Sequence, residues 1–348
     1  MTSFKIGDRE ISRQAPPYIV AEMSGNHNHD IGRARALIDA AAKAGADAVK
    51  LQTYRADTIT IRSDRPEFRI PGGLWKDRTL YELYEEAYTP WEWHGDLFAH
   101  ARAKGIDIFS SPFDLTAVDF LAALDAPAYK IASPEAIDWG LMEKVAATGK
   151  PVILSTGMAS NAEIGEAIEV LKSNGAGGIV VLHCISSYPA PTDQAHLAKI
   201  RRIAERFDVL TGLSDHTMGL EVPIAAVALG AVLIEKHFTL KRADGGVDSA
   251  FSLEAEELAE LVRATRLAHQ ALGDPEADDI EAERMNRQFR RSIYFVADLP
   301  AGAEIRPEHV KSIRPGLGLP PKHLRDIVGR RTKAPIAYGT PTSWELIA

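Results

Sequence analysis

Short apolar runs alternate with longer amphipathic stretches from Tyr18 to about Gly273, and this alternation dominates the chain. The apolar runs with the length of buried strands are YIVAE, ADAVKLQ, GIDIFS, PAYKIAS, PVILST, IVVLHC, DVLTG and AVLIEKH. Stretches with helical spacing, such as IGRARALIDAAAKAGA, lie between them. Because strand–helix repeats of this number favour a closed barrel, we predict a (β/α)8 TIM barrel over residues 1–275, with an open doubly wound sheet as the alternative.

Three parts of the chain depart from this rhythm. Residues 53–88 form a long loop after the second expected strand, where loops of a barrel commonly cover or shape the site. Residues 276–292 are highly charged, which indicates a linker or an exposed helix. Residues 293–348 carry many Pro and Gly between short apolar runs, which predicts a small β-rich domain.

Composition limits the function classes. The chain has 348 residues and 45% hydrophobic content, enough for a large core. Its 40 Lys and Arg against 48 Asp and Glu give a net charge of −8, which argues against a nucleic-acid or anionic membrane surface. An anionic substrate would therefore need a local cluster of bases. One cysteine, Cys184, and an opening without the order of a secretory leader favour a cytoplasmic protein.

Two histidines end neighbouring strand-like runs, His216 in LSDHTMG and His237 in IEKHFTL. One strand–helix–strand step separates them, so a parallel barrel would bring both imidazoles to one mouth. A single histidine at a strand end is more often structural than a ligand. The pair on adjacent strands favours a divalent metal site, for which Mn, Mg and Co all remain open.

Polar residues gather at the expected carboxyl ends of the strands. They are Glu22, Lys50, Gln52, Ser110, Ser111, Lys130, Ser133, Glu135, Ser155, His183, Ser214, His216, Glu235 and His237. Two lysines beside several hydroxyls suit a phosphate or carboxylate, and a Schiff-base lysine is the alternative. The pattern predicts an active site at this face of the barrel.

The motifs of the chain resemble those of the sialic-acid synthase family. They are IVAEMSGNHNHDIGRARALIDAAAKAGADAVKLQTY, SSPFD, AYKIAS, ILSTGMAS, LHCISSYPAP, GLSDHTMG, GAVLIEKHFTL and IRPGLGLPP, in the order that this family has them. The tail is similar to the antifreeze-like or SAF domain of the family. The segment FRIPGGLWKDRTLYELYEEAYTPWEWH is most similar to the pseudaminic acid branch.

This resemblance implies a metal-dependent condensation of phosphoenolpyruvate with the open-chain form of an N-acetylated sugar, which releases phosphate. It implies that His216 and His237 hold the metal, which polarises the sugar aldehyde. The residues expected to bind phosphoenolpyruvate are Lys50, Lys130, Ser133, Ser155 and Ser214. Those expected to face the sugar or the metal-bound water are Glu22, Gln52, Tyr188 and Asp248.

Three further expectations come from the resemblance. Glu135 would transfer the proton at that water, or would only partner a lysine, so the catalytic set is Glu22, Glu135 and His237. Arg314 would reach the sugar from a partner subunit, which implies a domain-swapped homodimer. Ser186 stands where sialate synthases usually carry Asn, which favours 2,4-diacetamido-2,4,6-trideoxy-beta-L-altropyranose over N-acetylmannosamine. A sialic or legionaminic acid synthase and a non-catalytic carbohydrate-binding protein remain as alternatives.

Overall fold

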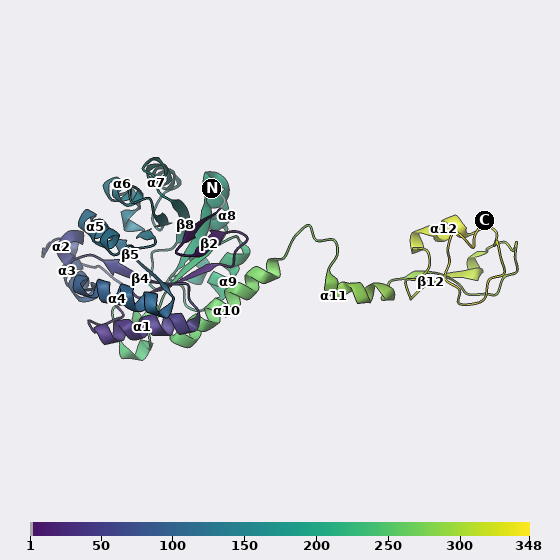
Figure 1. Ribbon diagram of the computed structural model, residues 1–348, viewed down its shortest axis with the longest axis horizontal. Helices are drawn as coiled ribbons and strands as arrows, with labels where there is room; N and C mark the ends of the chain where they lie inside the picture. Colours follow the sequence, from purple (N-terminus) through teal and green to yellow (C-terminus); the bar gives the residue numbers. More distant parts are fainter. Residues whose placement is uncertain (1–2) are drawn as a thin grey trace. The chain divides into compact units, whose positions relative to one another are not determined.

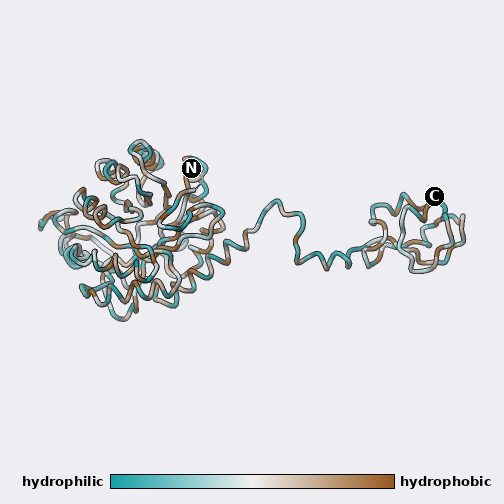
Figure 2. The backbone as a smooth tube through the Cα atoms, viewed as in Figure 1, coloured by the Kyte–Doolittle hydropathy of each residue, from teal (hydrophilic) through white to brown (hydrophobic). Residues whose placement is uncertain are grey.

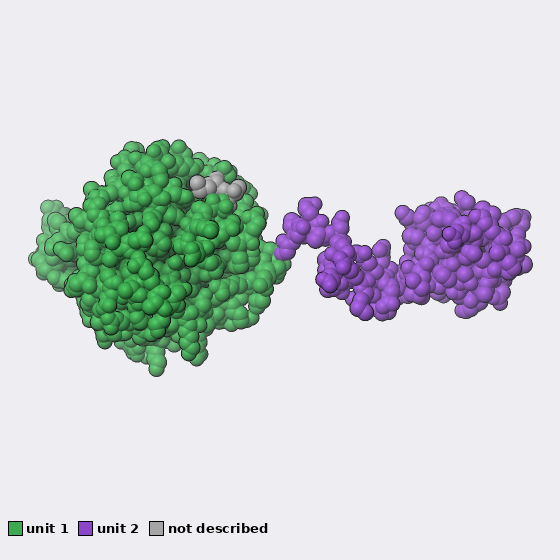
Figure 3. Space-filling view, in the orientation of Figure 1, with its two compact units in different colours: residues 1–272 green, residues 273–348 purple. Residues whose placement is uncertain are grey.

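The computed structural model describes residues 3–348, which form two compact units that divide between Leu272 and Gly273 (Figure 3). Each unit has its own apolar core, as expected for separate domains. No helix of the described residues is long and apolar enough to cross a membrane.

The first unit is a closed parallel barrel surrounded by helices (Figure 1). Around the barrel, β10 is followed by β3, β4, β5, β6, β7, β8 and β9, which returns to β10. The bounds are β3 Tyr18–Glu22, β4 Ala48–Thr53, β5 Asp107–Pro112, β6 Tyr129–Ile131, β7 Pro151–Ser155, β8 Gly178–Cys184, β9 Leu210–Asp215 and β10 Leu233–His237. These are the apolar runs of the sequence, so the predicted TIM barrel is confirmed and the open sheet is wrong.

The outer layer consists of helices with one apolar face each. Their bounds are α1 Ile31–Ala44, α4 Trp91–Lys104, α5 Leu115–Ala123, α6 Trp139–Ala146, α7 Asn161–Ser173, α8 Ala198–Phe207, α9 Glu221–Ala228 and α10 Ala255–Leu272. The first begins where the Asp30 carboxylate accepts from the amides of Gly32 and Arg33, and it ends at Gly45, whose φ of 83° suits glycine. It buries Leu37 and Ala41 on one stripe against the core.

An antiparallel hairpin of β1 Ser3–Ile6 and β2 Arg9–Ser12 joins the amino-terminal side of the barrel. Phe4, Ile6 and Ile11 belong to the same buried cluster as residues from the first halves of the barrel strands, such as Val180. Gly178 permits this packing, because an added Cβ would lie 2.3 Å from the Phe4 ring. The polar ends of the strands therefore lie at the opposite, carboxyl-terminal side.

Residues 53–88 are more ordered than the predicted loop. They contain α2 Ala56–Ile59, a 3-10 turn at Pro66–Phe68 and α3 Leu80–Ala87. The last of these starts with a capping box, in which the Thr79 hydroxyl accepts from the Glu82 amide and the Glu82 carboxylate accepts from the Thr79 amide. Further 3-10 turns of this unit are η2 Pro134–Ile137, η3 Thr192–Gln194, η4 Arg242–Asp244 and η5 Ser249–Phe251.

The second unit begins with mostly hydrophilic residues and then forms a small β-rich fold (Figure 2). β11 Ser292–Phe295 pairs antiparallel with β12 Val310–Ile313. The short helical elements are α11 Glu281–Arg284, η6 Met285–Phe289, η7 Pro307–His309, η8 Pro321–His323 and α12 Leu324–Ile327. Ile293, Phe295 and Ile305 lie at the centre of its core. The predicted small β-rich domain is confirmed.

Candidate active site at the carboxyl end of the barrel

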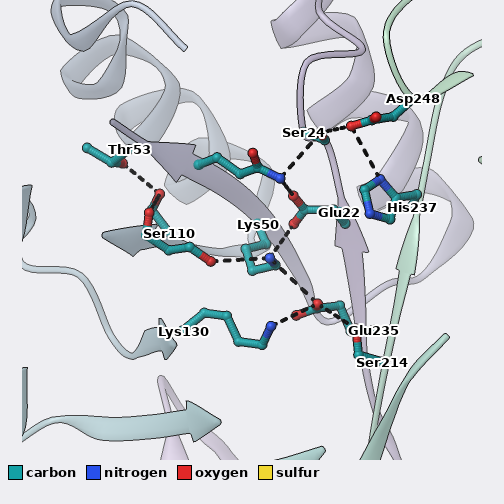
Figure 4. Close-up of polar contacts among 12 residues, drawn as sticks. Glu22, Ser24, Lys50, Thr53, Ser110, Lys130, Ser214, Glu235, His237 and Asp248 are labelled. Atoms are coloured by element: carbon teal, nitrogen blue, oxygen red, sulfur yellow. Dashed lines mark hydrogen bonds and ion pairs between the residues drawn. The ribbon is translucent and has the colours of Figure 1, made fainter. Parts of the chain in front are cut away.

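Four charged side chains meet inside the barrel near the strand ends (Figure 4). The Lys50 ammonium lies 2.8 Å from Glu22 Oε2 and 3.6 Å from Glu235 Oε1. The Lys130 ammonium lies 3.2 Å from the same Glu235 oxygen, which also accepts from the Ser214 hydroxyl at 3.1 Å. We call Glu22, Lys50, Lys130 and Glu235 the inner charge cluster; all four are buried.

Strand register explains why these residues meet. Glu22 pairs with Lys50 across β3 and β4, and Glu235 pairs with Ser214 across β10 and β9. Side chains alternate along a strand, so Glu235 and His237 share one side of β10. The charged residues therefore face the barrel interior as a set, although their strands are far apart in the sequence.

The electrostatics of the inner charge cluster favour an anion. Burial raises the pKa of Glu22, which shifts this carboxyl toward its neutral form despite Lys50. Burial opposes ionisation of Glu235 as well, but Lys130 and Lys50 outweigh it and lower the pKa of Glu235 to about 2. Burial also lowers the pKa of Lys130, because Glu235 only partly offsets the desolvation of its ammonium group, so an anion beside this lysine would stabilise its charged form.

The cluster continues through a chain of hydrogen bonds to Asp248, which lies beside His237. The Gln52 amide donates to Glu22 Oε1 at 2.8 Å and to the Ser24 hydroxyl at 3.3 Å. Ser24 in turn donates to Asp248, a carboxylate from the loop after β10. Asp248 Oδ2 lies 3.8 Å from His237 Nδ1, and burial raises the pKa of Asp248 to about 6. Gln52 and Asp248, which were predicted to face the sugar or the metal-bound water, therefore lie in one connected site with His237, a predicted metal ligand.

The two histidines lie side by side, with ring centroids 5.3 Å apart. His216 Nδ1 lies 2.9 Å from the Ile185 carbonyl and donates to it, so in the neutral ring Nε2 keeps its lone pair. Burial lowers the pKa of His237, and its Nδ1 is a buried atom without a hydrogen-bond partner in residues 3–348. A neutral imidazole with a free nitrogen fits a metal ion.

The ligand set for such a metal would be small. Within residues 3–348, no group of three or more His, Cys, Asp or Glu side chains could hold a metal ion together. The two imidazoles would therefore be the protein ligands, and water or substrate oxygens would complete the coordination.

Aromatic rings surround the two histidines. Tyr188, from the loop after β8, lies 4.4 Å from the His216 ring and 6.2 Å from the His237 ring, measured between centroids. Phe251 lies 4.9 Å from His237. Trp75, from the insertion 53–88, lies 5.5 Å from Tyr188. Tyr188 therefore lies beside both imidazoles, and its role toward the sugar or the metal-bound water stays a prediction.

The remaining predicted residues lie at the ends of β6 and β7. The Ser133 hydroxyl accepts from the Gly157 amide at 3.0 Å, and the Ser155 hydroxyl is buried without a partner among the described residues. Burial raises the pKa of Glu135 to about 7. Arg314 belongs to the second unit, where its side chain is exposed, and its role stays a prediction.

Sequence reasoning noted Glu235 at a strand end but gave it no role, although it contacts both lysines. The i, i+2 spacing from His237 was the available signal. Ser24, which joins Gln52 to Asp248, was missed; it lies two residues beyond the end of β3 with a φ of 49°, so strand alternation gives no signal for it.

A cavity of about 1070 Å³ opens beside the site, between the segments that follow β7 and β8. Cys184 and Ser186 line it on the side of His216, and Lys199 and Arg202 are among its other lining residues. These two basic side chains give the cavity lining local positive charge, although the chain has a net charge of −8.

A closed barrel with buried ionised groups at its carboxyl-terminal face has the architecture of a TIM-barrel enzyme. Comparison with protein families identifies the family to which this barrel belongs. Residues 37–277 match the NeuB family and residues 290–348 match the SAF domain, so the chain belongs to the NeuB family. The resemblance drawn from the motifs is confirmed.

Individual relatives cover nearly the whole chain. A pseudaminic acid synthase of Campylobacter jejuni is 44% identical over 92% of this chain and 94% of its own. An N,N'-diacetyllegionaminic acid synthase of Legionella pneumophila is 36% identical over 95% of this chain and 94% of its own. The crystal structure of an N-acetylneuraminic acid synthetase from Leptospira borgpetersenii, in complex with citrate, matches with a TM-score of 0.74 and 32% identity, over 82% and 95% of the two chains.

Proposed function

We propose that the chain is a pseudaminic acid synthase, which condenses phosphoenolpyruvate with 2,4-diacetamido-2,4,6-trideoxy-beta-L-altropyranose and releases phosphate. The observation that carries this proposal is the inner charge cluster beside two imidazoles, one with a free buried nitrogen. The choice of sugar is supported by the higher identity to a pseudaminic acid synthase, 44%, than to a legionaminic acid synthase, 36%.

Phosphoenolpyruvate is an anion that suits the two lysines. An ammonium group has three donors, and Lys130 has one protein acceptor, Glu235, among the described residues. Its other protons and the Ser155 hydroxyl are available for a carboxylate or phosphate of the substrate, whereas the Ser214 hydroxyl already donates to Glu235. An anion bound here would be shielded from bulk water, because all four residues of the inner charge cluster are buried.

His216 and His237 would hold a divalent metal, which supplies Lewis acidity for the sugar aldehyde when bound. Gln52, Ser24 and Asp248 form the hydrogen-bonding side that would orient the hydroxyls and amides of the open-chain sugar. The methylene carbon of phosphoenolpyruvate then bonds to the aldehyde carbon, and the cation left at C2 takes up water. Glu135 would accept the proton of that water before the C2–O bond to phosphate breaks.

Phosphate release tests this function. The assay combines phosphoenolpyruvate with the diacetamido altrose sugar or with N-acetylmannosamine, each with and without a chelator. Chelator-sensitive release with the altrose sugar alone is expected. Release with N-acetylmannosamine alone would assign the sialate reaction, and no release with either sugar would favour a binding protein.

The dimer and the cellular location are also proposals. We infer a domain-swapped homodimer in which Arg314 of one subunit completes the sugar site of the other; the cytoplasmic location stays a prediction. Mixing two inactive variants, His237→Ala and Arg314→Ala, tests the swap. Random exchange should restore about a quarter of the wild-type rate, because one site in each mixed dimer keeps both residues. No restoration would place Arg314 in the site of its own subunit, or outside it.

A further inference from the structure

An aromatic wall stands on one side of the two imidazoles. It consists of Trp75, Tyr188 and Phe251, whose ring centroids lie 5.5 Å apart for Trp75 and Tyr188, 5.3 Å for Tyr188 and Phe251, and 6.5 Å for Trp75 and Phe251. Tyr188 and Phe251 contact the histidines directly. Trp75 is therefore one ring away from the position where the sugar aldehyde would bind.

The protein fixes this tryptophan in place. The indole Nε1 donates to the Val247 carbonyl at 2.8 Å, which ties the insertion 53–88 to the loop after β10. Val247 is itself packed closely, since an added Cβ on Gly25 would lie 2.5 Å from it. Two backbone hydrogen bonds, from the Ile70 amide to the Arg78 carbonyl and from the Asp77 amide to the Ile70 carbonyl, hold the ends of the turn that carries Trp75. A half-buried indole with this support presents a rigid apolar face.

Polar side chains also lie beside the imidazoles, with Asp248 3.8 Å from His237 and with Ser24 and Gln52 hydrogen-bonded in line behind it. The sugar of the proposed function likewise combines apolar and polar groups. It carries apolar methyl groups on two acetamido substituents and at C6, whereas N-acetylmannosamine has one acetamido methyl and hydroxyls at the other two positions. An aromatic face gains free energy from burying methyl groups and gains none from hydroxyls left without partners.

We propose that Trp75 is a specificity-determining residue, whose indole forms the apolar wall that selects the diacetamido trideoxy sugar over a sugar with hydroxyls at C4 and C6. This inference rests on the proposed function. It assigns a role in substrate choice to the insertion 53–88, and it leaves the phosphoenolpyruvate site unchanged.

Steady-state kinetics of Trp75→Ala with both sugars, at saturating phosphoenolpyruvate, tests the wall. The KM for the altrose sugar should rise about 10- to 100-fold, the range that hydrophobic pockets give for small apolar groups. The KM for phosphoenolpyruvate and the chelator sensitivity should stay unchanged. The kinetic parameters for N-acetylmannosamine, if the enzyme turns it over, should change far less. The ratio of kcat/KM for the altrose sugar to kcat/KM for N-acetylmannosamine should therefore fall.

One further variant separates the apolar contact of Trp75 from its role in positioning the loop, and a second variant is a control. Trp75→Phe keeps an aromatic face but loses the bond to Val247, and it should retain most of the sugar preference. Trp139→Ala removes an exposed tryptophan from the start of α6 and should change neither KM. Thermal unfolding of each variant checks that the fold is intact.

Each other outcome has a distinct meaning. Equal losses with both sugars, or an equal rise in the KM values for sugar and phosphoenolpyruvate, would overturn the inference and leave the proposed function standing. Unchanged kinetics in Trp75→Ala would overturn it as well. A wild-type protein without phosphate release from the altrose sugar would overturn the proposed function, and the inference with it.

Discussion

Strand β10 carries two kinds of buried ion contact on adjacent residues. Lys236 donates to the Asp215 carboxylate and to the Thr217 carbonyl, the latter at 2.6 Å. Asp215 also accepts from the Thr217 amide and hydroxyl. Glu235, one residue earlier and on the opposite side of the strand, contacts Lys50 and Lys130 but keeps its Oε2 without a hydrogen-bond partner in the described chain.

The difference separates structure from function. A buried ion pair whose remaining atoms are satisfied has a structural role, here to fix the loop that carries His216 next to Asp215. A buried cluster with free oxygens, a free imidazole nitrogen and a free serine hydroxyl costs stability without a ligand. Such a cost is expected where substrate binding supplies the missing partners.

Lys236→Met should produce the largest effect on stability. It leaves Asp215 buried and without its counter-ion, so the free energy of unfolding should fall by about 3–5 kcal/mol. Chemical denaturation measures this change. Any loss of turnover per folded molecule would come through the loop that carries His216, because Lys236 does not contact the inner charge cluster.

The exposed pair of Lys144 and Asp119 provides the control. Lys144→Met should lower the free energy of unfolding by less than about 1 kcal/mol, since exposed ion pairs contribute little. If Lys236→Met lowered the free energy of unfolding as little as this control, the pair of Lys236 and Asp215 would not have the structural role assigned to it.

Lys130→Met should have the opposite result, with a large loss of activity and little change in the free energy of unfolding. Losing a charge-assisted hydrogen bond of about 1.5–3 kcal/mol to an anion should lower kcat/KM for phosphoenolpyruvate roughly 10- to 150-fold. Burial lowers the pKa of Lys130, so its charged form is already disfavoured in the free protein. The free energy of unfolding should therefore stay within about 1 kcal/mol of wild type or rise. A loss as large as that of Lys236→Met would abolish the distinction between the two sides of β10.

The fold was predictable because its signal is local. Each barrel strand is an apolar run within one short window, and the helices between them have a clear 3.6-residue period. The exception is α3, where the pattern inside residues 53–88 was read as loop. The sequence TLYE, which forms the Thr79–Glu82 capping box, was the missed signal.

The site was predictable only in part, because its contacts join distant residues. Strand ends indicated Lys50, Lys130 and both histidines, since all strands of a barrel end at one face. Which groups remain unpaired depends on side-chain geometry across several strands. The sequence therefore gave no way to distinguish the free Glu235 from the satisfied Lys236, or to place Trp75 beside Tyr188.

Glu135 gives the comparison a third case, a carboxyl that is shielded from water and has no lysine within ion-pair distance among the described residues. Burial raises its pKa to about 7. It is therefore mostly protonated below pH 7 and a carboxylate above. If it accepts a proton from water, the rate should fall roughly tenfold for each pH unit below 7, which is about 1.4 kcal/mol in activation free energy per unit. The pH profile of kcat between pH 5 and 9 measures this.

Glu135→Gln should remove this acid limb, whereas Glu143→Gln, a change on the exposed side of α6, should keep it. A limb near pH 6 that survives in Glu135→Gln would point to Asp248, whose pKa burial raises to about 6. A flat wild-type profile would leave Glu135 without a role in proton transfer. The proton would then pass to Glu22, whose pKa burial also raises, and the inner charge cluster would take part in the chemistry as well as in binding.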